Sequence, residues 1–193
     1  KRPELIERLR KILAQGQQAY WVCTLIEPSE EIEALSAEEA FDLLRRDLPE
    51  SRVALLHGRM KADEKAEVMR AFKAGEYQLL VATTVVEVGV DVPNATQMFI
   101  ENAERLGLAQ LHQLRGRVGR GSKASRCFLL FKPGVSQAGQ HRLNALRQSQ
   151  DGFYLAEQDL KLRGPGDILG TRQSGEQSFK IADLSEHAHL MPS

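Results

Sequence analysis

Short apolar runs alternate with segments of helical periodicity along most of this chain. Each run is apolar at nearly every position, not at alternate ones, and the runs cover residues 19–26, 52–56, 78–82, 97–100 and 126–131. A strand that is apolar on both faces has to be covered on both, which is typical of the parallel sheets of α/β proteins. The alternation therefore predicts a mostly parallel sheet with helices on both faces.

The intervening segments predict helices at residues 3–14, 36–48, 62–72 and 108–117, then a pair at 140–149 and 153–162. Ser36 and Glu39 form a possible capping box, so the second helix is expected to start there. A turn at 151–152 predicts that the last two helices form a hairpin. From residue 163 glycine is frequent and periodicity is lost, which predicts an extended tail. We expect one domain at 1–134 and a hairpin with tail at 135–193.

Composition excludes several classes of protein. Hydrophobic residues make up 42% of the chain and charged residues 27%, which argues against a disordered or fibrous chain. No apolar run reaches the length of about 18 residues that a membrane-spanning helix needs, so no membrane partner is expected.

Cys23 and Cys127 lie in apolar strand-like runs, which predicts buried thiols in a reducing cytoplasm and no metal site. Because Lys1 stands in place of Met, the chain is expected to be an excised fragment.

The positive charge is concentrated in one segment. Residues 101–150 carry nine Lys or Arg and two Asp or Glu, although the formal net charge of the chain is zero. Such asymmetry suggests an anionic partner, either nucleotide phosphates or a nucleic-acid backbone. A solvated basic face is the alternative.

The segment Gln113-Leu-Arg-Gly-Arg-Val-Gly-Arg120 carries the strongest chemical signal. Arg117 and Arg120 would share one face if the helix persists, and each follows a glycine that permits close backbone approach. Guanidinium groups placed in this way can meet the charge that builds on a transferring phosphoryl group. A basic helix end paired with local acids is the alternative. The segment resembles the QxxGRxGR motif of superfamily 2 helicases, which implies catalytic roles for Gln113, Arg117 and Arg120.

Polar residues also follow the strand predicted at 78–82. Thr83 and Thr84 lie at its carboxyl end, where open α/β sheets place their ligands, and their hydroxyls could hold a nucleic-acid phosphate. Ordinary capping threonines are the alternative. Residues 82–94 resemble motif V of the same superfamily, which implies that these threonines contact DNA and that Gly89 and Asp91 reach toward the nucleotide.

A weaker signal follows the strand predicted at 52–56. Leu56-His57-Gly58 resembles the LHG element of these motors, with Gly58 allowing a sharp turn toward the nucleic acid and His57 contacting a phosphate. His57 could equally be a satisfied turn histidine. Tyr20 and Trp21 begin a predicted strand, which indicates core packing, with base stacking as the alternative.

Residues 151–175 distinguish among such motors. They resemble the TRG motif, a helical hairpin plus loop shared by RecG helicases and the transcription-repair coupling translocase, and residues 163–175 are similar to the RecG version. Arg163 and Arg172 could hold the loop against the hairpin or the motor domain, with Glu157 and Asp159 as candidate partners of Arg172. A C-terminal wrap that only adds stability is the alternative.

The sequence contains no GxxxxGK[ST] loop and no DExH or DExD after a strand. The resemblance therefore implies that ATP and Mg²⁺ are held mainly by an N-terminal motor domain of the same protein, accompanied by a wedge domain. It implies a nucleoid-associated enzyme that remodels stalled forks and Holliday-type junctions in DNA repair and recombination, with this fragment inactive alone. A transcription-repair coupling translocase, or a non-catalytic nucleic-acid-binding module, is the alternative.

Overall fold

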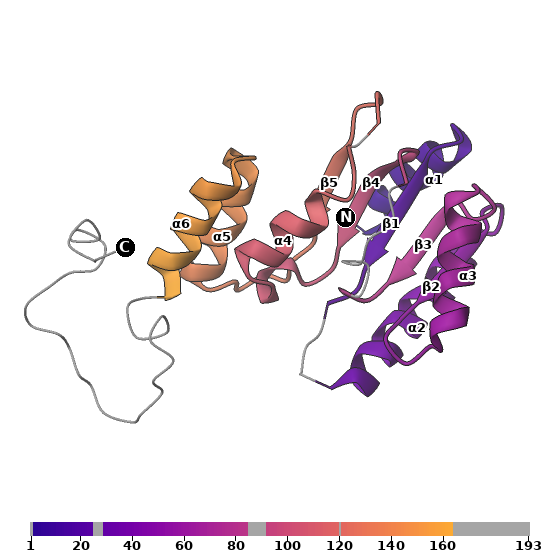
Figure 1. Cartoon of the computed structure of the whole chain (residues 1–193), viewed down its shortest axis with the longest axis horizontal. Coiled ribbons are helices and arrows are strands. Elements are labelled where there is room, and N and C mark those ends of the chain that lie inside the picture. The colour runs from indigo at the N-terminus through magenta and orange to yellow at the C-terminus, as the bar shows by residue number, and fades with distance from the viewer. Residues whose placement is uncertain (1, 25–28, 85–91, 120, 164–193) are drawn as a thin grey trace, which may run out of the picture.

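A computed structural model describes residues 2–24, 29–84, 92–119 and 121–163 of the chain. Five parallel strands form one sheet in the order β2-β3-β1-β4-β5, and a pair of helices follows it in the chain (Figure 1). The strands are β1 Gln18–Val22, β2 Val53–Leu56, β3 Leu79–Ala82, β4 Ala95–Ile100 and β5 Arg126–Leu129. The helices are α1 Arg2–Ala14, α2 Glu30–Asp47, α3 Ala62–Lys73, α4 Leu108–Arg115, α5 Gln137–Gln148, α6 Gly152–Arg163 and the 3₁₀ helix η2 Ala103–Arg105.

Alternate residues of each strand point to opposite faces of the sheet, and both faces are buried. Trp21 of β1 belongs to a cluster with residues of α1 and α2, whereas the next residue, Val22, belongs to a second cluster with residues of α3 and α4. Helices α1 and α2 thus cover one face, and α3 and α4 cover the other. The predicted parallel sheet with helices on both faces is confirmed.

Aromatic rings fill the face that α1 and α2 cover. Phe99 of β4 stacks on Trp21 at 5.1 Å between ring centroids and on Phe128 at 4.8 Å. On the opposite face Tyr20 meets Phe72 edge-on at 5.2 Å. Tyr20 and Trp21 are each 1% exposed, so their interpretation as core residues is confirmed.

Some predicted boundaries were wrong. Helix α2 begins at Glu30 after Ser29, and Ser36 lies inside it. The reason is that its buried stripe already begins at Ala34 and continues through Ala37, so burial extends the helix upstream of the apparent capping box. Strand β1 ends at Val22, short of residue 26, and residues 25–28 lie outside the described part of the chain.

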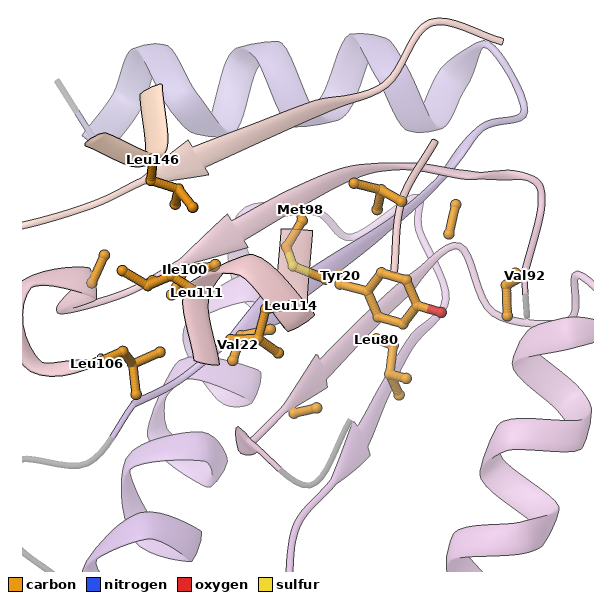
Figure 2. Close-up of a cluster of buried hydrophobic side chains, with 14 of the residues drawn as sticks. Tyr20, Val22, Leu80, Val92, Met98, Ile100, Leu106, Leu111, Leu114 and Leu146 are labelled. Atoms are coloured by element: carbon orange, nitrogen blue, oxygen red, sulfur yellow. The ribbon is translucent and has the colours of Figure 1, made fainter. Parts of the chain in front are cut away.

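The predicted helical hairpin is confirmed, and it shares the core of the sheet domain. Leu146 of α5 and Leu155 of α6 are buried in the same cluster as Leu111 and Leu114 of α4. Figure 2 shows Leu146, Leu111 and Leu114 converging near Ile100 of β4. Helix α5 starts after Ser136, whose hydroxyl accepts from the Gly139 N–H at 3.1 Å. The tail predicted beyond residue 163 lies outside the described residues.

The stacked rings provide a test of this packing. We expect Phe99→Ala to lower the free energy of unfolding by about 3–5 kcal/mol, because a fully buried aromatic ring leaves a cavity. Phe153→Ala is the matched control, since Phe153 is 91% exposed and its removal should change stability by about 0.5 kcal/mol or less. Urea denaturation of the 193-residue chain measures both. Similar values for the two variants would contradict the assigned core.

Candidate functional site

Two of the predicted DNA-contacting segments lie side by side at the carboxyl edge of the sheet. Leu56 of β2 and Ala82 of β3 are register partners, and the Thr83 N–H donates to the Leu56 carbonyl at 3.1 Å. His57 and Thr83 therefore leave neighbouring strands at the same level. This is the edge where parallel sheets place their ligands.

The two threonines after β3 differ in exposure. The Thr83 side chain is fully buried, and its hydroxyl has no hydrogen-bond partner in the described part of the chain. The contact of Thr83 with the DNA backbone stays a prediction. Thr84 is half-buried, so it is the more accessible of the pair.

His57 is nearly buried against α2. Its side chain is 11% exposed, its Nε2 lies 3.5 Å from Glu38 Oε1, and its Nδ1 has no partner among the described residues. The carbonyl of Gly58 accepts from Lys65 Nζ at 2.7 Å. Gly58 itself has no positive φ, and no atom lies within 4 Å of an added Cβ. Contrary to the expectation, neither backbone conformation nor space calls for glycine in this turn.

The arginine-rich segment does not continue the helix. Helix α4 ends at Arg115 with Gly116 as its C-cap, and Gly119 has a φ of +85°. An added Cβ at Gly119 would lie 2.5 Å from Ser125 Oγ, so both backbone conformation and space call for glycine. These glycines end the helix before Arg117, so the condition under which the two arginines would share one helical face is not met. Arg117 is half-buried in the turn, and Arg120 lies outside the described residues.

The turn after α4 packs against the end of the segment that resembles motif V. Val118 and Val92 belong to the same buried cluster, and Lys123 Nζ donates to Asn94 Oδ1 at 3.0 Å. An added Cβ at Gly121 would lie 2.8 Å from the Pro93 carbonyl oxygen. Gly89 and Asp91 are outside the described residues, but the residues that follow them are held beside the turn that carries Arg117.

The described candidate residues lie at different ends of the strands. His57, Gly58, Thr83 and Thr84 follow the carboxyl ends of β2 and β3, whereas the turn that carries Arg117 packs on residues 92–94, which lead into the amino end of β4. Gln113 is exposed on α4.

The coupling residues are described only in part. Arg163 is the last residue of α6, and Arg172 lies outside the described residues. Glu157, one candidate partner of Arg172, already forms an ion pair with Lys161 Nζ at 2.8 Å. Asp159 is half-buried on the same helix. The expected pairing of Arg172 remains a prediction.

Sequence reasoning missed Arg115. Its guanidinium donates from one nitrogen to the Leu146 and Ser149 carbonyls at 2.6 and 2.8 Å, and its other terminal nitrogen lies 2.9 Å from His112 Nδ1. Burial lowers the pKa of Arg115 from its ordinary value. The available signal was a third arginine within the motif, one that precedes the first glycine and faces the apolar side of the helix.

Both cysteines lie among the described residues. Cys23 is buried and Cys127 half-buried, and burial raises the pKa of Cys127 to about 12. None of the described helices has the length and apolarity needed to cross a bilayer. Across the same residues, no three His, Cys, Asp or Glu side chains gather as metal ligands.

Comparison with known families places both parts of the chain. Residues 4–122 match the family described as helicase conserved C-terminal domain. Residues 149–192 match the family described as ATP-dependent DNA helicase RecG, domain 3, C-terminal. The two matches follow each other in the order of the sheet domain and the hairpin.

The curated relatives extend along the whole chain. ATP-dependent DNA helicase RecG of Escherichia coli strain K12 is 58% identical over 193 residues, which is 100% of this chain and 28% of the relative. The RecG of Bacillus subtilis strain 168 is 50% identical over 178 residues, covering 91% of this chain and 26% of the relative. The chain therefore spans about a quarter of the length of these relatives.

Solved structures agree with this similarity. A structure of RecG bound to a three-way DNA junction matches 97% of this chain and 24% of that chain, with 44% identity and a TM-score of 0.73. Saccharomyces cerevisiae Dbp5 bound to RNA and ADP BeF3 matches 80% of this chain and 36% of that chain at 17% identity and a TM-score of 0.52, which shows a shared fold alone. The chain belongs to the helicase conserved C-terminal domain family, and over its whole length it is similar to the C-terminal part of RecG-type ATP-dependent DNA helicases.

Proposed function

We propose that this chain is the second motor domain, with its coupling hairpin, of an ATP-dependent translocase on double-stranded DNA. The observation that carries the proposal is 58% identity to RecG over all 193 residues. The whole protein would remodel stalled forks and Holliday-type junctions in the cytoplasm, at the nucleoid. The domain would comprise residues 1–134, and the hairpin with its tail 135–193.

The arginine segment fits the role of a wall of the nucleotide cleft. Arg117 lies in a turn whose Val118 is buried in the same cluster as Val92, so the turn is anchored in the core while the Arg117 side chain is half-buried. Held in this way, Arg117 and Arg120 would meet the charge that builds on the transferred phosphoryl group. Gln113, Gly89 and Asp91 would line the same wall. ATP and Mg²⁺ would be held mainly by an N-terminal motor domain.

The carboxyl edge of β2 and β3 fits a track for the DNA backbone. Thr84 and the backbone around Gly58 would contact phosphates directly, while the buried Thr83 and His57 would fix the two turns. Branched DNA and the N-terminal motor and wedge domains are the proposed partners. Because the Arg117 turn packs on residues 92–94 near the amino end of β4, away from this track, closure of a nucleotide cleft at that turn would move the whole domain along the DNA.

We expect the 193-residue chain alone to lack ATPase activity, since catalysis by positioning needs both walls of the cleft. Phosphate release is measured for the pure chain with and without branched DNA, beside the full-length protein as positive control. DNA-stimulated turnover by the chain alone would contradict the proposal.

We expect Arg117→Ala or Arg120→Ala in the full-length protein to lower kcat by about 10³-fold with little change in the KM for ATP, because such arginines act on the transition state. Arg147→Ala, an exposed arginine in the last turn of α5, is the matched control. A kcat within about threefold of the parent, far below that scale, would make the arginine structural.

We expect Arg172→Ala to uncouple ATP hydrolysis from movement of the protein along DNA. DNA-stimulated hydrolysis should persist while fork and junction unwinding collapses, because a multidentate guanidinium contact that holds the loop is lost. Both activities and the melting temperature are measured on one full-length preparation. Proportional loss of both activities with a lower Tm would identify a stabilising role only.

A further inference from the structure

Arg115 joins the sheet domain to the hairpin through partly buried hydrogen bonds. It is the last residue of α4, and its guanidinium reaches the Leu146 and Ser149 carbonyls at the end of α5 at 2.6 and 2.8 Å. Ser149 is the C-cap of α5. The last carbonyls of a helix have no intrahelical partner, and a cation there also faces the negative end of the helix dipole. Arg115 therefore caps α5 from outside the hairpin.

His112, one turn earlier on α4, extends the contact to α6. Its Nδ1 lies 2.9 Å from the second terminal nitrogen of Arg115, which fixes the imidazole ring. An added Cβ at Gly152, the first residue of α6, would lie 3.1 Å from His112 Nε2. The ring thus lies directly against the start of α6. The pair of side chains touches both helices of the hairpin where they are connected.

A rigid connection needs more than one point of attachment. Arg142, in the middle of α5, donates to the Glu104 carbonyl of η2 at 2.9 Å. Leu143 and Leu146 of α5 are buried against the same cluster as Leu111 and Leu114 of α4. Helix α5 is therefore held along its length, and the polar contact of Arg115 fixes the end nearest the turn.

We propose that Arg115 is a positioning residue that transmits movement of the Arg117 turn to the hairpin, with His112 and Gly152 completing the joint. This inference rests on the proposed function. Only Gly116 separates Arg115 from Arg117, so a displacement of the Arg117 turn pulls directly on the residue that caps α5. The planar guanidinium meets all three acceptors at once, which the single ammonium group of lysine cannot do in the same geometry.

The test uses Arg115→Gln, Arg115→Lys and Gly152→Ala in the full-length protein, with Arg147→Gln as control. Base pairs unwound per ATP hydrolysed should fall about tenfold in the three joint variants, because small misplacements can cost up to about a hundredfold. Arg147→Gln should keep the parent ratio. Gly152→Ala lies outside the nucleotide wall and should leave hydrolysis at the parent rate.

Hydrogen exchange gives a readout that does not depend on activity. Amides at the end of α5 and the start of α6 should exchange about tenfold faster in Arg115→Gln than in the parent or in Arg147→Gln. In the double variant His112→Ala with Gly152→Ala these amides should exchange no faster than in the more severe single variant, because both changes act on one contact. If the Arg115 variants fail to fold, the double variant replaces them in the measurement.

Unchanged exchange in Arg115→Gln would overturn the joint itself. Faster exchange with an unchanged ratio of unwinding to hydrolysis, or with both activities and Tm falling in proportion, would reduce Arg115 to a stabilising residue and overturn its role in transmission. If the parent protein neither hydrolyses ATP on DNA nor unwinds it, the proposed function fails, and the exchange result then decides the joint alone.

Discussion

The sheet is buried on both of its sides, and the remainder of the molecule is arranged around that burial. Alternate residues of β1 lie in two separate clusters, one closed by α1 and α2 and the other by α3 and α4. Parallel strands require crossover connections, and the crossovers from β1 to β2, from β2 to β3 and from β4 to β5 supply the covering helices α2, α3 and α4. Because the strands are parallel and in register, the turns that follow β2 and β3 emerge together at one edge. The position of the candidate DNA track follows from this geometry.

Helix α4 connects the two parts of the chain. Its Leu111 and Leu114 face the sheet cluster that also contains Leu146 and Leu155 of the hairpin, so a single core runs from β4 into α5 and α6. The same helix carries the exposed Gln113 and ends where the Arg117 turn begins. A segment for which we propose chemical and mechanical roles is therefore also a core helix. Rigid packing on both sides of α4 favours movement of the sheet domain and hairpin as one body.

Glycine and burial determine how the arginine segment is presented. Gly116 ends α4, and Gly119 adopts a left-handed conformation beside Ser125. The chain then turns back toward residues 92–94, which places the segments resembling two separate helicase motifs beside each other. Thr83 is fully buried and His57 nearly so, while Thr84 is more accessible. Position along a motif thus does not decide which side chain is accessible.

The sequence alone determined the α/β class, the two covered faces, the core roles of Tyr20 and Trp21 and the helical hairpin. These features follow from local periodicity and from runs of apolar residues, which a single chain segment carries within itself. The motif spacing likewise indicated the helicase family. Tertiary structure decided the rest: the upstream start of α2, the burial of Thr83 and the contacts of Arg115. Each of these depends on atoms distant in sequence, such as the Leu146 carbonyl that meets the Arg115 guanidinium, and local pattern holds no information about such partners.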